Sequence, residues 1–152
     1  MSHTHTYRST LSWEGSTADG YDHYGRAHTA AVAQRTLNLS ADPAFKGDAA
    51  TPNPEQLLLA AASSCQLLSF LACAARSRID VIAYTDEAEA LMPEDDLPVR
   101  ITQITLRPRI TVAAGANVDR VDRLVDKAHQ ECYVANTLNA QTRIEAEVTI
   151  AT

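Results

Sequence analysis

Two cysteines, Cys65 and Cys132, are the residues of this chain whose type and spacing best support chemistry. Cys65 lies in the middle of a long apolar segment, and Cys132 follows 67 residues later, just after a separate helical pattern. Three cysteines in all is an odd number, which argues against a disulfide framework. In a reducing compartment, two thiols from distant segments are more often redox-active than structural. The pair therefore predicts redox chemistry.

The third cysteine, Cys73, cannot pair with Cys65 within one chain. Eight residues on one helix separate their Cα atoms by about 12 Å, whereas a disulfide tolerates no more than about 7 Å. Cys132 can in principle meet either of them, and Cys65 is the better candidate because polar residues flank it. These neighbours are Ser63, Ser64 and Gln66. Alanines flank Cys73, so we interpret it as core packing.

A reactive Cys65 must be ionised, and the pKa of a free cysteine is about 8.5. The helix dipole acts within roughly the first turn, and Cys65 lies about three turns into its predicted helix. A cation must therefore come from another segment. Arg26 is the first choice, with Arg8 and Arg35 as alternatives. An arginine in an apolar site needs a carboxylate beside it, and Glu55 is placed in the sequence for that role.

The spacing of Glu55 and Cys65 constrains how they could share a site. Ten residues separate them, which is about 15 Å along a continuous helix. Glu55 then cannot reach the Cys65 of its own chain. Either the helix starts later than its pattern indicates, or Glu55 comes from a second subunit. We predict the second: a homodimer whose paired central helices bring Glu55 of one chain near Cys65 of the other.

The patterns along the chain predict an α+β fold with the order β-β-β-α-β-β-α-β. Antiparallel sheets are expected to surround a long buried central helix. The predicted strands cover residues 7–13, 26–34, 36–40, 81–92, 100–112 and 144–151. Residues 42–52 are expected to form a loop, and Pro93–Pro98 the turn of a prominent hairpin. A second helix should begin after Asn117 and end near Cys132.

The central helix has a clear start signal. Asn53 is a favourable N-cap, Pro54 suits the first turn, and Gln56 can complete a capping box with Asn53. From there to Arg76 the sequence is nearly all Leu, Ala, Ser, Cys and Phe. A helix that is apolar on every side is expected to be buried on every side.

Size and charge exclude several classes of protein. A chain of 152 residues is expected to form one domain across residues 1–152. The net charge is −6 and the basic residues are scattered, so no nucleic-acid-binding face is expected. No membrane span is expected either, because no run approaches 18 continuous apolar residues. The first residues are polar and lack an apolar core, so no signal peptide is expected and the cytoplasm is the predicted location.

Several segments together resemble the OsmC/Ohr family, the osmotically inducible and organic hydroperoxide resistance proteins. These are Asn53–Leu58 (Asn-Pro-Glu-Gln-Leu-Leu), Cys65, and Glu131–Asn136 (Glu-Cys-Tyr-Val-Ala-Asn). Two further segments, Asp42–Asp48 and Tyr84–Ala90, resemble the OsmC-like branch. The similarity extends over nearly the whole chain. Each cysteine motif alone is weak, whereas both at this separation are quite specific.

The resemblance implies an intertwined homodimer that reduces organic hydroperoxides with thiols. Cys65 matches the peroxidatic cysteine, Cys132 the resolving cysteine, and Glu55 the glutamate that holds an activating arginine. Arg26 matches that arginine, although the loop Asp19–Gly25 departs from the Gly-Gly-Arg pattern of the Ohr branch. The implied reaction takes Cys65 to a sulfenic acid and then to a disulfide with Cys132. The resemblance implies that an external dithiol of the lipoyl type reopens the disulfide, and that no metal, flavin or other cofactor is required.

Two other interpretations compete with this one. His129-x-x-Cys132 has metal-ligand spacing, and His23 and His28 lie in the N-terminal region, but paired ligand motifs of a zinc site are missing. We interpret His129 as a solvated helix-end residue. The second alternative is a non-catalytic OsmC-like dimer that binds a small molecule or is structural. Such a protein needs neither the two cysteines nor Glu55.

Overall fold

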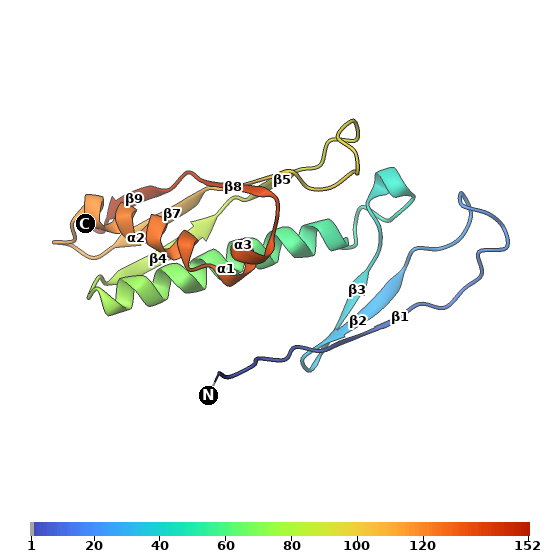
Figure 1. The fold of residues 1–152 in the computed structure, drawn as a ribbon, viewed down its shortest axis with the longest axis horizontal. Coiled ribbons are helices and arrows are strands. Elements are labelled where there is room, and N and C mark those ends of the chain that lie inside the picture. The colour runs from blue at the N-terminus through green and yellow to red at the C-terminus, as the bar shows by residue number, and fades with distance from the viewer. Residues whose placement is uncertain (1) are drawn as a thin grey trace. The chain divides into compact units, whose positions relative to one another are not determined.

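The computed structural model describes residues 2–152, which form two compact units. The first unit ends at Leu57 and the second comprises Leu58–Thr152. The division falls near the start of helix α1 (Pro54–Arg76), which is the first helix labelled in Figure 1. A single domain across residues 1–152 stays a prediction.

The first unit contains the antiparallel meander that the sequence predicts. Strands β1 (Ser9–Ser12), β2 (His28–Val32) and β3 (Arg35–Leu39) form one sheet with β2 in the middle (Figure 1). The β2–β3 turn is tight, and Ala33 there has a positive φ of 54°. The order of strands is confirmed. Strands β1 and β2 are shorter than their patterns suggested, whereas β3 has the predicted length and begins one residue earlier.

The segment before α1 is a loop with one 3-10 turn, Pro43–Phe45. A reciprocal capping box then starts α1, as predicted. The Asn53 side chain accepts a hydrogen bond from the Gln56 backbone N–H at 2.9 Å, and the Gln56 side chain accepts one from the Asn53 N–H at 3.1 Å. Two of the N–H groups that a helix start leaves without partners are thereby satisfied.

Six strands form two three-stranded sheets in the second unit. They are β4 (Val81–Asp86), β5 (Glu89–Leu91), β6 (Gln103–Leu106), β7 (Pro108–Val112), β8 (Gln141–Ile144) and β9 (Glu147–Ile150). One sheet has the order β4-β7-β9 and the other β5-β6-β8. The hairpin is confirmed, since β7 pairs antiparallel with β4 and β6 with β5. The last strands, β9 and β8, pair in parallel with β7 and β6.

Each of the long predicted strands is therefore two shorter ones, and a tertiary hydrogen bond accounts for the central break. The backbone N–H of Arg107, between β6 and β7, donates to the side-chain carboxylate of Asp86 at the end of β4, at 2.7 Å, instead of to a backbone carbonyl. Pro108 follows and has no N–H to donate. Both features interrupt the hydrogen-bond ladder at one point along the sheet.

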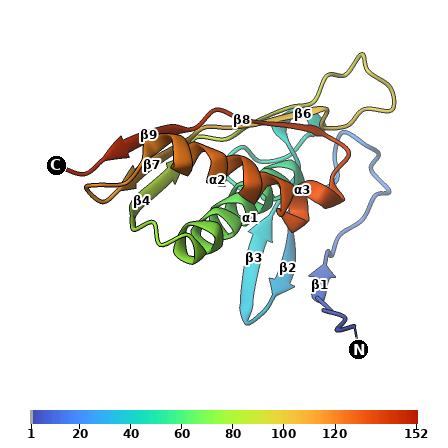
Figure 2. The same cartoon turned by 60° about the vertical axis from the view of Figure 1, so that its left-hand side comes forward.

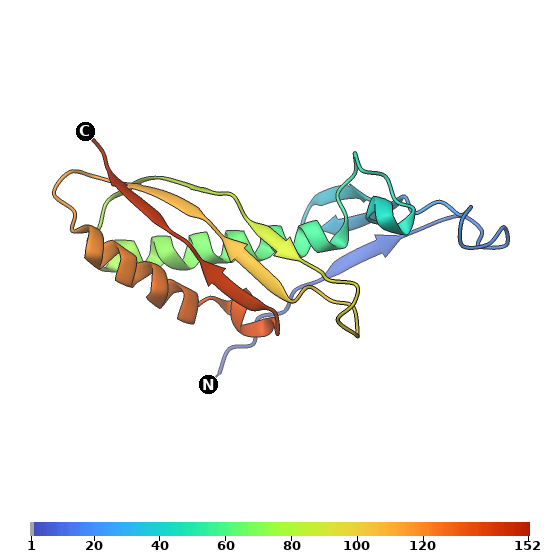
Figure 3. The same cartoon turned by 90° about the horizontal axis from the view of Figure 1, so that it is seen from above.

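Helices cover one face of these strands, as Figures 2 and 3 show. Helix α2 (Val118–Gln130) begins at Asn117, whose side chain accepts from the Arg120 N–H at 2.9 Å, so the predicted cap is confirmed. A short helix, α3 (Tyr133–Thr137), follows Cys132 and was not predicted. The fold is α+β, with α1 as its central helix.

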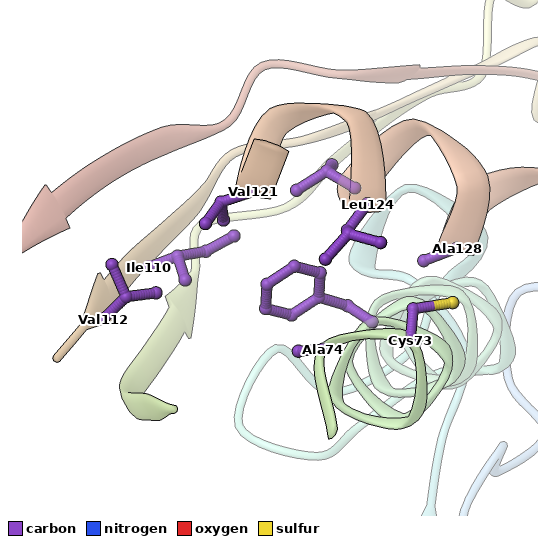
Figure 4. Packing of buried hydrophobic residues seen from close by; sticks show 9 residues of the cluster. Cys73, Ala74, Ile110, Val112, Val121, Leu124 and Ala128 are labelled. Atoms are coloured by element: carbon purple, nitrogen blue, oxygen red, sulfur yellow. The ribbon is translucent and has the colours of Figure 1, made fainter. Parts of the chain in front are cut away.

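The largest core lies between α1, α2 and β7. Phe70 of α1 is completely buried there, next to Leu124 and Ala128 of α2. Figure 4 shows side chains from both helices meeting those of Ile110 and Val112 on β7. One polar group also joins the helices, because the buried Gln66 side chain donates to the Val125 carbonyl at 3.2 Å.

Burial of α1 is one-sided within a single chain, which corrects the expectation of burial on every side. The buried residues form one stripe: Ala62, Gln66, Phe70, Cys73 and Ala74. On another side the apolar Leu68 is 63% exposed and Leu71 is 37% exposed. By length and composition alone α1 could also span a membrane, a property that core helices share. An exposed apolar side on a central helix indicates a surface that another partner can cover.

We expect Phe70→Ala to lower the free energy of unfolding of the second unit by about 3–5 kcal/mol, because it leaves a cavity at the centre of the core. Leu97→Ala, at a position that is 77% exposed, should change it by less than about 0.5 kcal/mol. Urea unfolding followed by circular dichroism measures both. Equal effects would show that Phe70 is not central to the core.

Candidate active site

The structure brings Cys65 and Cys132 together in the second unit. Cys65 is partly buried in α1, and Cys132 is 1% exposed at the start of α3. The backbone N–H of Val134, two residues after Cys132, donates to Cys65 Sγ at 3.5 Å, and the Cys65 thiol is near enough to raise the pKa of the Cys132 thiol. Both are free thiols. The two cysteines are therefore neighbours in the folded second unit, although 67 residues separate them in the sequence.

The packing of α2 on α1 places the two sulfurs. Gln66, the residue after Cys65, is bonded to the α2 backbone at Val125, and Ala128 of α2 is fully buried against α1. The chain leaves α2 after Gln130 and turns directly into α3. Cys132 lies at that turn, so the packing of α2 on α1 places it near Cys65.

The two thiols differ in their surroundings. Burial raises the pKa of the Cys132 thiol, and the nearby Cys65 thiol raises it further. The backbone N–H groups of Ala135 and Val134 act in the opposite direction without overcoming burial. Cys132 is therefore a protonated thiol at neutral pH, whereas Cys65 is the more accessible sulfur.

Cys73 is buried in the α1–α2 core, which agrees with its interpretation as packing (Figure 4). Its thiol donates a hydrogen bond to a carboxylate oxygen of Glu131 at 3.6 Å. Burial raises the pKa of the Cys73 thiol, and Glu131 adds to the effect. The other carboxylate oxygen of Glu131 lies 3.8 Å from Lys127 Nζ. Cys73 is therefore held in its unreactive, protonated form.

Cys65 opens into a cavity of about 220 Å³ in the second unit. The residues that line it come from α1 and from the α2–α3 connection: Cys65, Leu68, Ser69, Ala72, Arg76, Glu131 and Tyr133. Arg76 is not among the site residues that the sequence predicts. The sequence spacing could have predicted that Arg76 shares a cavity with Cys65, because residues 65, 69, 72 and 76 lie on one face of a helix.

The other two predicted site residues, Arg26 and Glu55, line a cavity of about 360 Å³ in the first unit. The Arg26 guanidinium lies 3.6 Å from the ring centroid of Tyr24 and 4.8 Å from that of Tyr21, and it donates to the backbone carbonyls of both. Among residues 2–152, no ion pair within 4.0 Å joins Arg26 to Glu55. Aromatic rings and carbonyls hold this arginine within the single chain.

The four predicted residues thus lie as two pairs, one in each unit. Helix α1 is continuous from Pro54, so Glu55 and Cys65 lie on one helix and are ten residues apart along it. Arg26 is partly buried, whereas the alternatives Arg8 and Arg35 are exposed. The assignment of Arg26 as the activating arginine stays a prediction.

His129 is not the fully solvated helix-end residue that the sequence suggested. The residue is partly buried, and its Nδ1 is buried without a hydrogen-bond partner. Among the described residues, no group of three or more His, Cys, Asp or Glu side chains could hold a metal ion.

The protein thus has an α+β fold in which a partly exposed thiol lies beside a buried one. These features indicate a candidate dithiol site. The OsmC-like protein family matches residues 46–147, which is more than half of the chain, and the chain belongs to this family. No curated protein matches the sequence significantly.

Solved structures share the fold. An OsmC-like protein of unknown function from Vibrio cholerae is 24% identical, with a TM-score of 0.84 over 96% of this chain and 100% of that one. An organic hydroperoxide resistance protein OsmC, also described as a predicted redox protein, from Legionella pneumophila is 19% identical, with a TM-score of 0.71 over 97% and 99%. The organic hydroperoxide resistance protein OhrB of Bacillus subtilis is 18% identical, with a TM-score of 0.62 over 95% and 98%.

Alkylation of the native protein should distinguish the three thiols. We expect N-ethylmaleimide to label Cys65 first at pH 7, because Cys73 and Cys132 are buried and their raised pKa values leave little thiolate. Below its pKa, the thiolate fraction of each buried thiol should grow about tenfold per pH unit. Peptide mass spectrometry measures the rates from pH 6 to pH 9. Faster labelling of Cys132 than of Cys65 at pH 7 would contradict this description of the site.

Proposed function

We propose that the protein is a thiol-dependent peroxidase that reduces organic hydroperoxides to alcohols. The observation that carries the proposal is the contact between Cys65, which opens into a cavity, and the buried Cys132. Relatives of the same fold described as organic hydroperoxide resistance proteins add support. The catalytic residues of the proposal are Cys65, Cys132, Arg26 and Glu55.

The reaction begins at the accessible thiol. The Cys65 thiolate attacks the distal oxygen of the hydroperoxide, the O–O bond breaks, and the alkoxide takes a proton and leaves as an alcohol. Cys65 is then a sulfenic acid. The Cys132 sulfur, after losing its proton, attacks the Cys65 sulfur, so that a disulfide forms and the hydroxyl leaves as water. An external dithiol, which we take to be of the lipoyl type, reduces the disulfide by exchange and is itself oxidised.

The raised pKa of Cys132 fits the resolving role. A protonated, buried thiol does not compete for peroxide, so oxidation falls on Cys65. Cys132 has to ionise only after a sulfenic acid lies beside it. The unequal environments of the two sulfurs therefore set the order of the steps.

The proposal requires a homodimer. Cys65 needs a cation, and Arg26 with Glu55 is the predicted source, but Glu55 lies about 15 Å along α1 from the Cys65 of its own chain. The exposed apolar Leu68 and Leu71 on α1 supply a surface that a second copy can cover. In this arrangement each active site combines Cys65 and Cys132 of one subunit with Arg26 and Glu55 of the other. The cytoplasm, where dithiols are kept reduced, is the proposed location.

Peroxide consumption tests the chemistry directly. With cumene hydroperoxide and dihydrolipoamide, the wild type should turn over, and Cys65→Ser should lose all turnover. Cys132→Ser should react once and stop as a sulfenic acid that dimedone traps at Cys65. Peptide mapping of the wild type after one equivalent of peroxide should find the Cys65–Cys132 disulfide, and Cys73→Ser should leave it unchanged. A wild type that consumes no hydroperoxide with any dithiol would favour the non-catalytic dimer.

Mixed dimers test whether two chains build each site. In a hybrid of a Cys65→Ser chain with a Glu55→Gln chain, one site contains both mutations, and the other retains Cys65 from the second chain with Glu55 from the first. We expect each variant alone to be strongly impaired and the hybrid to recover about half of the wild-type turnover per dimer. Differently tagged chains, refolded together and separated, provide the sample. A hybrid as inactive as its parents would place Glu55 and Cys65 of the same chain in one site.

A further inference from the structure

A buried hydroxyl group without a partner lies in the core of the second unit. The side-chain oxygen of Tyr84, on β4, is buried, and no group among residues 2–152 forms a hydrogen bond with it. Buried polar groups are nearly always hydrogen-bonded, so such an exception calls for an explanation. The atom is buried within a single chain, so a second copy that covers α1 does not reach it.

The ring of Tyr84 is held between β4 and the two helices. Its centroid lies 5.9 Å from that of Phe70 on α1, and the residue packs against the core that Phe70 forms with Leu124 and Ala128 of α2. Cys132 follows α2 after one residue and is buried as well. The hydroxyl therefore belongs to the part of the core into which the Cys132 thiol points.

The surroundings of the hydroxyl include two groups that carry or acquire negative charge. Burial raises the pKa of Tyr84, and the nearby Asp86 carboxylate and Cys132 sulfur raise it further. One oxygen of Asp86 already accepts from the Ser63 hydroxyl and the other from the Arg107 backbone N–H. Of the two neighbours, Cys132 is the one whose charge changes in the proposed reaction.

That reaction creates a negative charge inside the core. Cys132 must lose its proton before its sulfur attacks the oxidised Cys65, and burial opposes this ionisation. The backbone N–H groups of Ala135 and Val134 favour the thiolate, but the N–H of Val134 also donates to Cys65 Sγ. Tyr84 is a neutral phenol at neutral pH because its pKa is raised, so its proton is available for a hydrogen bond.

We propose that the Tyr84 hydroxyl donates a hydrogen bond to the Cys132 thiolate in the second step of the reaction, which makes Tyr84 a further catalytic residue. The inference rests on the proposed peroxidase function. The hydroxyl keeps its own proton throughout. The S–S bond forms as the S–O bond of the sulfenic acid breaks, and the sulfenic hydroxyl leaves as water with the proton that Cys132 released. Tyr84 gives up no other hydrogen bond to act in this way.

A purely structural tyrosine predicts a different result. If Tyr84 only fills the core, its ring does so, and the hydroxyl is unfavourable because a buried polar group without a partner costs free energy. Tyr84→Phe keeps the contact with Phe70 and removes the hydroxyl alone. The variant should then be as stable as the wild type or more stable, and no step of turnover should change.

Single-turnover kinetics with cumene hydroperoxide separates the two steps in Tyr84→Phe. We expect the Cys65 sulfenic acid to form at the wild-type rate. The Cys65–Cys132 disulfide should then form about tenfold more slowly, which is the size of effect that one hydrogen bond to a charged group can have. Rapid quenching followed by peptide mass spectrometry measures both rates.

Tyr7→Phe is the matched control, because it removes the hydroxyl of a tyrosine that is 89% exposed. Both rates should stay at the wild-type value in this variant. Circular dichroism and urea unfolding verify that Tyr84→Phe and Tyr7→Phe are folded.

A second measurement does not depend on peroxide chemistry. In a Cys65→Ser, Cys73→Ser chain, Cys132 is the one remaining cysteine, so the pH dependence of its labelling by iodoacetamide follows its ionisation. Adding Tyr84→Phe should move the midpoint of labelling to higher pH, because the thiolate loses a donor and the pKa of Cys132 rises. Adding Tyr7→Phe should leave the midpoint where it is.

Three results would overturn the inference. They are disulfide formation at the wild-type rate in Tyr84→Phe, equal slowing of both steps, and a labelling midpoint of Cys132 that does not move. A wild type that forms no sulfenic acid with any hydroperoxide would instead overturn the proposed function and the catalytic role with it. The labelling midpoint would still show whether the Tyr84 hydroxyl stabilises the Cys132 thiolate.

Discussion

The contact between α1 and α2 is the interaction on which the candidate site depends. Two thiols 67 residues apart meet only because Phe70 and Gln66 of α1 fix α2 at a defined distance and register. Phe70 supplies the apolar packing and Gln66 a single buried hydrogen bond. The chain then has two residues between the end of α2 and the start of α3, which leaves Cys132 little freedom to lie anywhere but beside Cys65.

The same packing gives the two sulfurs different properties. In the two-residue connection after α2, Glu131 is exposed and Cys132 is buried, so the Cys132 thiol is hard to ionise. Cys65 lies at the margin of the buried stripe of α1 and stays accessible. The division that we propose between an attacking and a resolving thiol therefore rests on position in the fold, because the two side chains are chemically identical.

The sequence predicted those features that local signals determine. The capping boxes and N-caps at Asn53 and Asn117 depend on side chains within three residues, and both were recognised correctly. The break at Arg107 was not, because it depends on the Asp86 side chain of β4, which is 21 residues away in the sequence although β4 pairs with β7. The place of Arg76 in the Cys65 cavity was not predicted, because a basic residue in the last turn of a helix already has a local role at the negative end of the helix dipole. Whether α1 is buried on every side cannot be read from one chain, since an apolar surface has the same composition whether its own chain or a partner covers it.

The need for a cation at Cys65 connects these observations. Along α1, Glu55 precedes Cys65 by ten residues and Arg76 follows it by eleven, so neither side chain is a close neighbour of the sulfur on its own helix.

The first unit contains a different arginine, Arg26, which the rings of Tyr21 and Tyr24 hold in a cavity shared with Glu55. A guanidinium stacked on aromatic rings is already partly removed from water, so it loses less solvation when it approaches a thiolate. An arginine prepared in this way in one unit, and an accessible thiol on an incompletely covered helix in the other, are complementary. In the homodimer that we propose, a second copy of the chain would supply both at once, because it would cover the apolar side of α1 and contribute the charge that Cys65 needs.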